Sequence, residues 1–264
     1  MKPKFDATRL ITPALLAVFI LLWHFYVTWF GISRFIIPPP LEVWDALIDL
    51  LTTPSTLRHA WATLYETLLG FLIASIIGVA LGTALGKTAW LERAANPFIV
   101  ATQVVPKVAL VPLFILWFGF GPESKIVVAA VLAFFPVLTN TVLGIKSVEA
   151  GHRDVMTVLN ASRWQNFLSP ELPSSLPAVL AGMEVGIVLS IIGAVVGEYL
   201  GGATGLGYLL VTSMNNYKVG MLFAVIVLLT VIGFLLYLLI GALRRLVIPW
   251  HESARVLRRA YDGT

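Results

Sequence analysis

Apolar residues dominate six windows along the chain, and short polar or Pro/Gly-rich segments separate these windows. The windows cover about residues 11–30, 64–85, 97–118, 126–143, 178–196 and 221–243. A helix of about 20 apolar residues crosses the hydrocarbon core of a bilayer, which is about 30 Å thick. Such a helix also satisfies its own backbone hydrogen bonds, which lipid cannot do. The pattern therefore predicts an all-α polytopic membrane protein with six spanning helices.

One polar segment, residues 149–173, has the features of a folded loop. Apolar residues in its first half recur at the spacing of one helix face, and Asp154 is expected at the positively polarised start of that helix. Asn160 follows, and asparagine tolerates the left-handed conformation that often ends a helix. The residues of the apolar face are Val155, Val158 and Leu159.

The same segment then predicts a second short helix. Ser162 and Gln165 fit the S-x-x-Q capping box that begins a helix. Trp164 and Phe167 would give this helix an aromatic surface, and Pro170 is expected to stop it because proline lacks a backbone N–H. Exposed aromatic rings on a bent helical loop suit a groove in a partner protein. An amphipathic loop that rests on lipid headgroups is the simpler alternative.

Lysine and arginine are distributed unevenly between the two sides of the membrane that six spans define. Thirteen lie on the side of the N-terminus, four lie on the opposite side, and Lys107 lies within a span. By the positive-inside rule, both termini are cytoplasmic, and the basic tail 244–264 lies beside anionic lipid. Topology therefore accounts for the net charge of +4, and we expect no binding to nucleic acid.

The composition agrees with a membrane protein and argues against catalysis. Only 12% of the residues are charged, against about 25% in soluble domains, and the absence of cysteine excludes disulfides and Cys-based metal sites. The stretch LGTALGKT (81–88) has Leu81 where a nucleotide-binding P-loop needs glycine. Gly78, Gly82 and Gly86 instead predict a close-packing helix face. We expect no ATP site, bound cofactor, metal site or catalytic residue in this chain.

Charged residues within the spans are functional candidates, because lipid disfavours an unpaired charge. Lys107 follows Pro106 near the middle of the third window, and two copies of the chain would place a ring of positive charge there for an anion. Alternatively, Lys107 extends to the interface or pairs with Glu66 or Glu184. An ion pair with a structural role is the expected function of Glu184.

Two segments on the predicted outer side complete the list of candidates. Glu198 precedes the Gly-rich residues 201–207, which permit a non-helical excursion, and it is expected in an outer gate or in the dock for a partner. Residues 32–61 contain a Pro-rich break followed by an amphipathic run, which predicts a short interfacial helix.

The polar segment 149–173 also resembles the coupling loop of ABC-importer permeases, whose signature is Glu-Ala-Ala, three residues, Gly, nine residues, then Ile-x-Leu-Pro. Asp154 stands 19 residues before Pro173, with Asn160 at the glycine position. The departures are Asp-Val-Met for Glu-Ala-Ala, Asn160 for Gly and Pro170 for Ile. By this resemblance, the residues expected to contact an ATPase subunit are Asp154, Leu159, Asn160, Ala161, Ser162, Arg163, Trp164, Phe167, Leu172 and Pro173.

Four further stretches are similar to the permease subfamily for nitrate, taurine and alkanesulfonates, and the similarity runs over about residues 35–245. The stretches are VPKVALVPLFILWFGFGPESKI (105–126), FFPVLTNTVLGIKSV (134–148), LPSSLPAVLAGMEVGI (172–187) and GEYLGGATGLGY (197–208). The resemblance implies a type I ABC importer permease fold, similar to methionine permeases, in the inner (cytoplasmic) membrane.

The resemblance also implies partners and a mechanism. The expected partners are two cytoplasmic ATPase subunits that bind ATP and Mg, a second and identical permease copy, an extracytoplasmic substrate-binding protein and the lipid bilayer. The implied function is a translocation pathway for a small anion such as a sulfonate, taurine or nitrate, opened by alternating access. One alternative is the same importer class carrying a pyrimidine-type vitamin precursor or an aromatic acid. The other is an ATP-independent carrier or channel, which would not need the loop 149–173.

Overall fold

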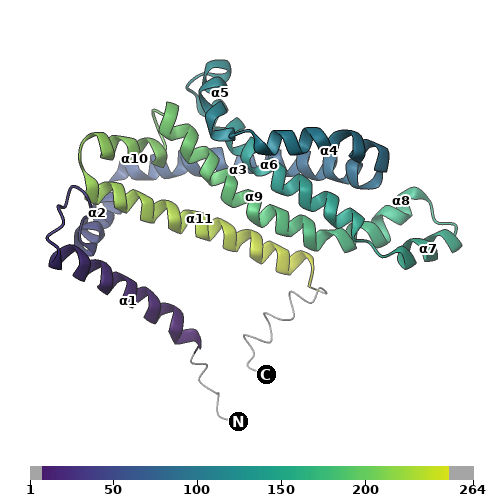
Figure 1. The fold of residues 1–264 in the computed structure, drawn as a ribbon, viewed down its shortest axis with the longest axis horizontal. Helices are drawn as coiled ribbons and strands as arrows, with labels where there is room; N and C mark the ends of the chain where they lie inside the picture. Colours follow the sequence, from purple (N-terminus) through teal and green to yellow (C-terminus); the bar gives the residue numbers. More distant parts are fainter. Residues whose placement is uncertain (1–7, 250–264) are drawn as a thin grey trace, which may run out of the picture.

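The computed structural model describes residues 8–249, and this part of the chain folds into helices joined by short turns (Figure 1). Lys2, Lys4 and residues 250–264 of the basic tail, which we expect in the cytoplasm, lie outside the described residues. The helices are α1 (Thr8–Trp29), α2 (Pro40–Thr52), α3 (Pro54–Lys87), α4 (Ala89–Val104), α5 (Val111–Phe118), α6 (Pro122–Lys146), α7 (Ala150–Val158), α8 (Arg163–Asn166), α9 (Leu172–Gly201), α10 (Leu206–Asn215) and α11 (Val219–Val247). A 3₁₀ turn (Lys107–Leu110) precedes α5, and a π-helical turn (Phe167–Glu171) joins α8 to α9.

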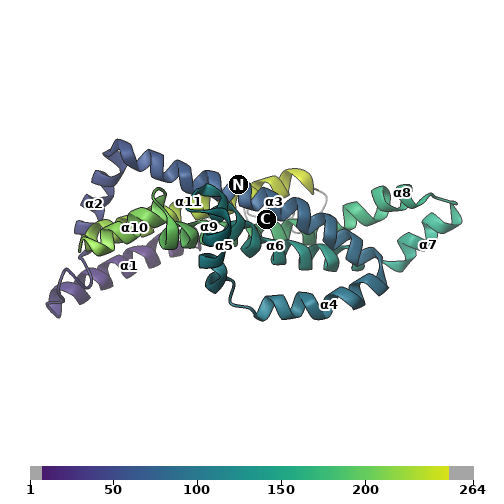
Figure 2. The ribbon, with the colours of Figure 1, turned by 90° about the horizontal axis from the view of Figure 1, so that it is seen from above.

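The centre of the molecule is formed by α3, α6 and α9, which run side by side with α11 along the long axis (Figures 1 and 2). Glycines allow α3 and α6 to pack closely. A Cβ atom added at Gly78 would lie 2.9 Å from a Val137 methyl, and one at Gly82 would lie 2.6 Å from the Thr141 Cβ. The predicted glycine packing face is therefore confirmed, and its partner is α6.

Five helices within residues 8–249 are long and apolar enough to cross a membrane, and a bent pair raises the number to six. The bent pair includes the third predicted window, where one spanning helix was expected. Ala89–Val104 and Lys107–Phe118 meet there at 82°. Pro106 explains the break, because proline lacks a backbone N–H and forces the preceding Val105 into an extended conformation. Figure 2 shows α4 standing apart from α3 and α6.

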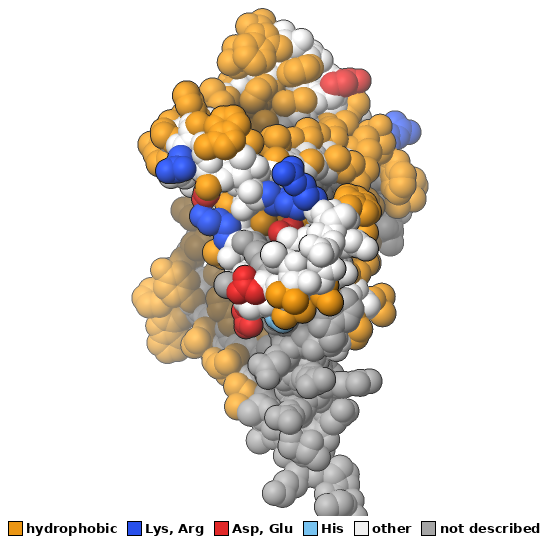
Figure 3. Space-filling view, turned by 90° about the vertical axis from the view of Figure 1, so that its right-hand side faces the viewer, with side chains coloured by type: hydrophobic (Ala, Val, Ile, Leu, Met, Phe, Trp, Pro, Cys, Tyr) orange, Lys and Arg blue, Asp and Glu red, His pale blue; other side chains and the backbone are white. Residues whose placement is uncertain are grey.

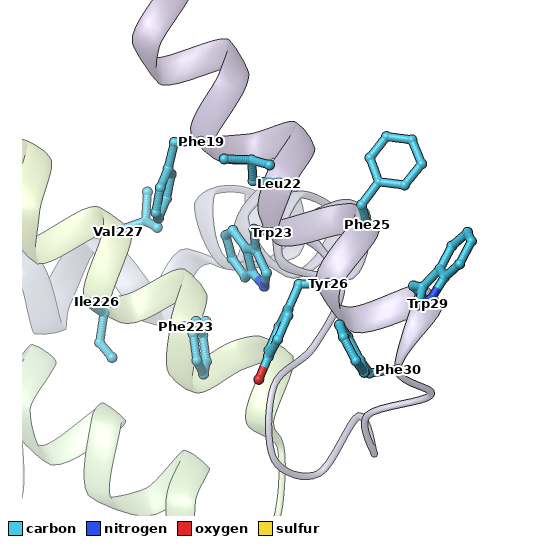
Figure 4. Close-up of a pocket in the computed structure, with 10 residues that line it drawn as sticks. All are labelled: Phe19, Leu22, Trp23, Phe25, Tyr26, Trp29, Phe30, Phe223, Ile226 and Val227. Carbon is cyan, nitrogen blue, oxygen red and sulfur yellow. The ribbon is translucent and has the colours of Figure 1, made fainter.

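The first predicted span, α1, lies at the margin of the bundle and leaves an apolar groove of about 790 Å³ beside α11. Figure 4 shows Phe19, Trp23 and Tyr26 on the side of α1 that faces α11, whereas Phe25 and Trp29 point away. The Trp23 and Phe223 rings are 6.0 Å apart, centroid to centroid. A lipid-like environment suits this groove, because its lining is almost wholly apolar.

The predicted short outer helix is α2, and it packs on the protein as well as facing outward. Leu50 is buried in one cluster with Leu206 of α10 and with Ala224 and Val225 of α11. The apolar side of α2 therefore covers the end of the bundle at which α10 and α11 meet.

Candidate functional site

The loop 149–173 is folded, and its first helix extends further than the sequence indicates. Because α7 begins at Ala150, Asp154 lies in the middle of the helix, and the expectation that it starts the helix is wrong. The expected apolar face of α7 projects outward: Val158 is 83% and Leu159 is 69% exposed. Large exposed apolar residues on a structured polar loop indicate a surface for a partner or for a membrane.

The bend and the start of the second helix follow the sequence prediction. Asn160 adopts a left-handed conformation with φ of 51°. The Ser162 hydroxyl accepts a hydrogen bond from the Gln165 N–H at 3.3 Å, and the Gln165 side chain accepts one from the Ser162 N–H at 2.8 Å. These two bonds form the predicted capping box. Trp164 is 67% exposed, and its ring lies 5.8 Å from that of Phe167.

Pro170 does not stop the second helix, which corrects another expectation. It lies within the π-helical turn Phe167–Glu171, where the Leu172 N–H donates to the Phe167 carbonyl five residues earlier. The wider turn accommodates a residue without an N–H, so the chain passes from α8 into α9 without leaving the helical path. Pro173 then lies in the first turn of α9.

Lysine and arginine side chains gather, with a few carboxylates, on the end of the molecule that carries α7 and α8 (Figure 3). Two ion pairs connect separate helices there. The Lys87 ammonium lies 2.8 Å from Glu171 Oε2, and the Lys146 ammonium lies 2.8 Å from Glu92 Oε1. These ion pairs join α3 to the π-helical turn and α6 to α4 at the end from which the loop projects.

Lys107 lies at the bend between α4 and α5, beside a pocket of about 470 Å³. Its ammonium is 4.8 Å from the centroid of the Phe135 ring and 3.5 Å from the Gln103 carbonyl oxygen. Gln103, Phe135 and Thr139 line the same pocket, and sequence reasoning did not select them. The break at Pro106 gives this place its shape, because it turns the start of the 3₁₀ helix toward α6.

The two carboxylates considered as alternatives for Lys107 lie elsewhere. Glu184 of α9 pairs with Arg244 of α11 at 3.2 Å, which agrees with the ion pair expected for Glu184. Glu66 of α3 is buried beside Glu198 of α9 and Lys125 of α6. Lys107 therefore pairs with neither Glu66 nor Glu184, and its ammonium instead contacts the Gln103 carbonyl and the Phe135 ring.

Glu198 is fully buried and holds the start of α10. Its carboxylate accepts hydrogen bonds from the Thr63 hydroxyl at 2.6 Å and from the Gly207 N–H at 2.7 Å. Thr63 in turn accepts a hydrogen bond from the Leu206 N–H at 2.8 Å. A negative charge is favourable at this helix start, because the first N–H groups of a helix are unpaired and positively polarised.

A second residue of α3, His59, holds the turn between α9 and α10. His59 Nδ1 accepts a hydrogen bond from the Gly205 N–H at 3.1 Å, and the His59 ring stacks on Tyr208. Gly205 has a φ of 104°, which glycine adopts without strain, and the predicted non-helical excursion is present between α9 and α10. His59 and Thr63 were missed because no local pattern signals a partner more than 130 residues away.

Apolar helices long enough to span a membrane, one pair of them bent beside a cationic pocket, define a multi-pass membrane protein with a folded loop at one end. The comparisons with known proteins give the particular class. The chain belongs to the family of binding-protein-dependent transport system inner membrane components, whose model matches residues 74–250. It is a permease subunit of an ABC importer in the cell membrane, and a separate partner subunit hydrolyses ATP.

Three curated relatives cover most of the chain. The riboflavin transport system permease protein RibX of Chloroflexus aurantiacus is 37% identical over 95% of this chain and 93% of its own length. The formylaminopyrimidine transport permease protein ThiX of Halalkalibacterium halodurans is 32% identical over 88% and 92%. The putative aliphatic sulfonates transport permease protein SsuC of Bacillus subtilis is 31% identical over 90% and 86%.

A solved structure of the MetNI methionine ABC transporter, in an inward-facing conformation, matches the fold. The TM-score is 0.64 at 20% identity, over 72% of this chain and 95% of that one. The predicted fold class, a type I importer permease similar to methionine permeases, is confirmed. The predicted permease family is confirmed as well. The cytoplasmic position of the termini stays a prediction.

Proposed function

We propose that two copies of this chain form the pathway of an importer for a small anion of the sulfonate, taurine or nitrate type. The observation that carries this proposal is the position of Lys107. Its ammonium lies at the break in a spanning segment, beside a pocket that also holds the Gln103 and Thr139 side chains. A cation with neighbouring hydrogen-bonding groups attracts and orients an anionic oxygen, which a wholly apolar pathway does not.

The second copy is supported by α4 and by the pocket itself. None of the described side chains of α4 is buried, and the pocket is open on one side. Two copies related by a two-fold axis would cover this face and bring both Lys107 side chains to one pathway. The chain requires ATPase subunits for energy, and we propose that a pair of them binds Mg and ATP and receives one loop 149–173 from each permease.

Energy transfer would proceed by alternating access. ATP binding closes the ATPase pair, the two loops move with it, and α9 moves because the π-helical turn joins it directly to α8. The exposed side chains of Val158, Leu159 and Trp164 are the contact surface that this mechanism needs. A rigid displacement of helices then opens one end of the pathway while it closes the other.

A second candidate solute class is a planar heteroaromatic compound, such as a pyrimidine-type vitamin precursor. The Phe135 ring favours it, because the ring lines the pocket beside Lys107 and an aromatic ring attracts another flat ring. The relatives named for riboflavin and formylaminopyrimidine support this class, and the relative named for aliphatic sulfonates supports the first.

Uptake of radiolabelled taurine, labelled nitrate and riboflavin tests both classes, in cells that express the chain with its own ATPase and binding protein. We expect Lys107→Met to lower anion uptake about tenfold or more, because a hydrogen bond to a charged group contributes about 1.5–3 kcal/mol. Lys107→Arg should keep most of the activity. Lys218→Met is the matched control, since Lys218 is an exposed lysine before α11, away from the pocket.

The outcomes separate the possibilities. Unchanged anion uptake by Lys107→Met would contradict the proposed pathway. The heteroaromatic class would be favoured if the unsubstituted protein transported riboflavin but neither taurine nor nitrate, and if Phe135→Leu lost riboflavin uptake. Uptake that continues when the ATPase subunit is omitted would show an ATP-independent carrier or channel.

A further inference from the structure

A side chain of α3, that of Lys87, contacts the base of the loop 149–173. Lys87 is the last residue of α3, and its ammonium lies 2.8 Å from Glu171 Oε2 and 4.6 Å from the centroid of the Phe167 ring. Phe167 and Glu171 are the first and last residues of the π-helical turn between α8 and α9. One ammonium group therefore contacts both ends of this turn from a different helix.

The environment makes this contact stronger than an ordinary surface ion pair. The Glu171 side chain is 7% exposed and that of Lys87 is 35% exposed, so water screens the pair only in part. The ammonium also lies at the C-terminal end of α3, where the helix dipole favours positive charge. The aromatic face of Phe167 adds an attractive contact to the same cation.

The turn that Lys87 contacts is the weak point between the loop and the spanning helix. A π-helical turn interrupts the regular i→i−4 hydrogen bonding of an α-helix, and Pro170 removes one backbone donor from it. A force applied to α8 would bend the chain here before it moved α9. A contact from α3 to both ends of the turn resists that bending and includes α3 in the displacement.

We propose that Lys87 is a positioning residue for energy coupling, through its contacts with Glu171 and Phe167. It keeps the π-helical turn rigid, so that movement of the loop displaces α3 and α9 together. This inference rests on the proposed role of the loop as the contact with the ATPase. The consequence is specific. Without the Lys87 contact, the ATPase still binds to this chain and hydrolyses ATP, but the hydrolysis rate no longer responds to the extracytoplasmic binding protein.

The chain offers a matched control pair at the same end of the molecule. Lys146 at the end of α6 pairs with Glu92 of α4, also at 2.8 Å, and this pair does not involve the π-helical turn. Lys87→Met and Lys146→Met each remove one ammonium group and keep an unbranched side chain. Only the first removes a contact with the turn.

The test uses the purified complex of this chain, its ATPase and its binding protein in lipid vesicles. The measured quantity is the ATP hydrolysis rate with the binding protein divided by the rate without it. The binding protein is purified from its native cells. We expect Lys87→Met to lower this ratio about fivefold or more, the lower end of typical coupling free energies, with assembly unchanged. Lys146→Met should stay within about twofold of the unsubstituted complex. Lys87→Arg should restore the ratio, since it can make both contacts.

A charge reversal keeps the proposal testable if Lys87→Met fails to assemble. The double variant Lys87→Glu/Glu171→Lys should recover assembly and a larger ratio than Lys87→Glu alone. An unchanged ratio in Lys87→Met, an equal loss in Lys146→Met, or no rescue by arginine would overturn the assignment of Lys87.

A loop variant separates this proposal from the function on which it rests. Trp164→Glu alters the exposed loop surface and leaves the Lys87 contact in place. If Trp164→Glu keeps both ATPase binding and the full ratio, the coupling role of the loop fails. If Trp164→Glu loses them while Lys87→Met behaves as Lys146→Met does, only the inference about Lys87 fails.

Discussion

The start of α10 is held by the Thr63 hydroxyl, and Thr63→Val should release it. Valine has nearly the shape of threonine, so the substitution removes the hydrogen bonds of the hydroxyl and little else. Besides a contact with the His59 carbonyl of its own helix at 3.2 Å, the hydroxyl makes two bonds to other helices. Glu198 Oε1 loses its donor at 2.6 Å, and the Leu206 N–H loses its acceptor at 2.8 Å. Both groups lie on fully buried residues, so water does not replace the lost partners while α10 stays in place.

The magnitude follows from these two unsatisfied groups. Each costs about 1–2 kcal/mol in a membrane protein, which gives about 2–4 kcal/mol for the pair. At about 1.4 kcal/mol for each factor of ten, the population with α10 detached should rise roughly 30- to 700-fold. Thr63→Ser keeps the hydroxyl and should stay close to the unsubstituted protein.

Cysteine labelling measures this population directly. The chain contains no cysteine, and Ser213 of α10 is 4% exposed, so Ser213→Cys gives a single buried thiol. The rate of maleimide labelling should rise by the predicted factor when Thr63→Val is added. Thr230→Val is the control, because the Thr230 hydroxyl is exposed and bonds only the Ile226 carbonyl of its own helix. Equal labelling rates in the Thr63→Val and Thr230→Val proteins would refute the reasoning.

Two further predictions concern the loop and the glycine packing face. Trp164→Glu should abolish uptake and co-purification of the ATPase without unfolding the spans, as circular dichroism would show. Trp90→Glu changes an equally exposed tryptophan outside the loop and should keep co-purification; uptake at the original rate in Trp164→Glu would contradict the coupling role. Gly82→Ala should lower the free energy of unfolding by about 1–3 kcal/mol, since its Cβ would lie 2.6 Å from that of Thr141. Gly151→Ala, with open space around its Cβ, is the control, and equal thermal inactivation of the two would refute the packing argument.

The sequence was sufficient wherever a short-range pattern determined the structure. Hydrophobic windows located the spanning helices, and four-residue spacing identified the α3 face that packs on α6. The Ser162–Gln165 capping box and the left-handed Asn160 depend only on neighbouring residues, and both are present. In each case, the physical cause lies within about one or two helical turns.

Where the sequence was insufficient, the structure depends on contacts or chain geometry that a short pattern does not specify. Pro170 breaks an isolated helix, yet here a π-helical turn continues the helical path and packs against Lys87. The third window was expected to hold one spanning helix. The break at Pro106 has a local cause, the missing proline N–H, but the sequence did not indicate how sharply the chain would turn there. The partner of Glu198 could not be predicted, because Thr63 and Glu198 are separated by 135 positions in the chain.

These contacts give α3 an unusual position in the molecule. Near its start, His59 and Thr63 hold the N-terminal end of α10, and at its end Lys87 holds the π-helical turn of the loop. Between the two ends, the glycine face of α3 packs directly against α6 and leaves no gap between the two helices. A displacement of α3 at Lys87 must therefore be accommodated at Thr63, because close-packed helices transmit displacement rather than absorb it. If the loop transmits force as we propose, the hydrogen bonds that hold α10 are contacts that this displacement would strain.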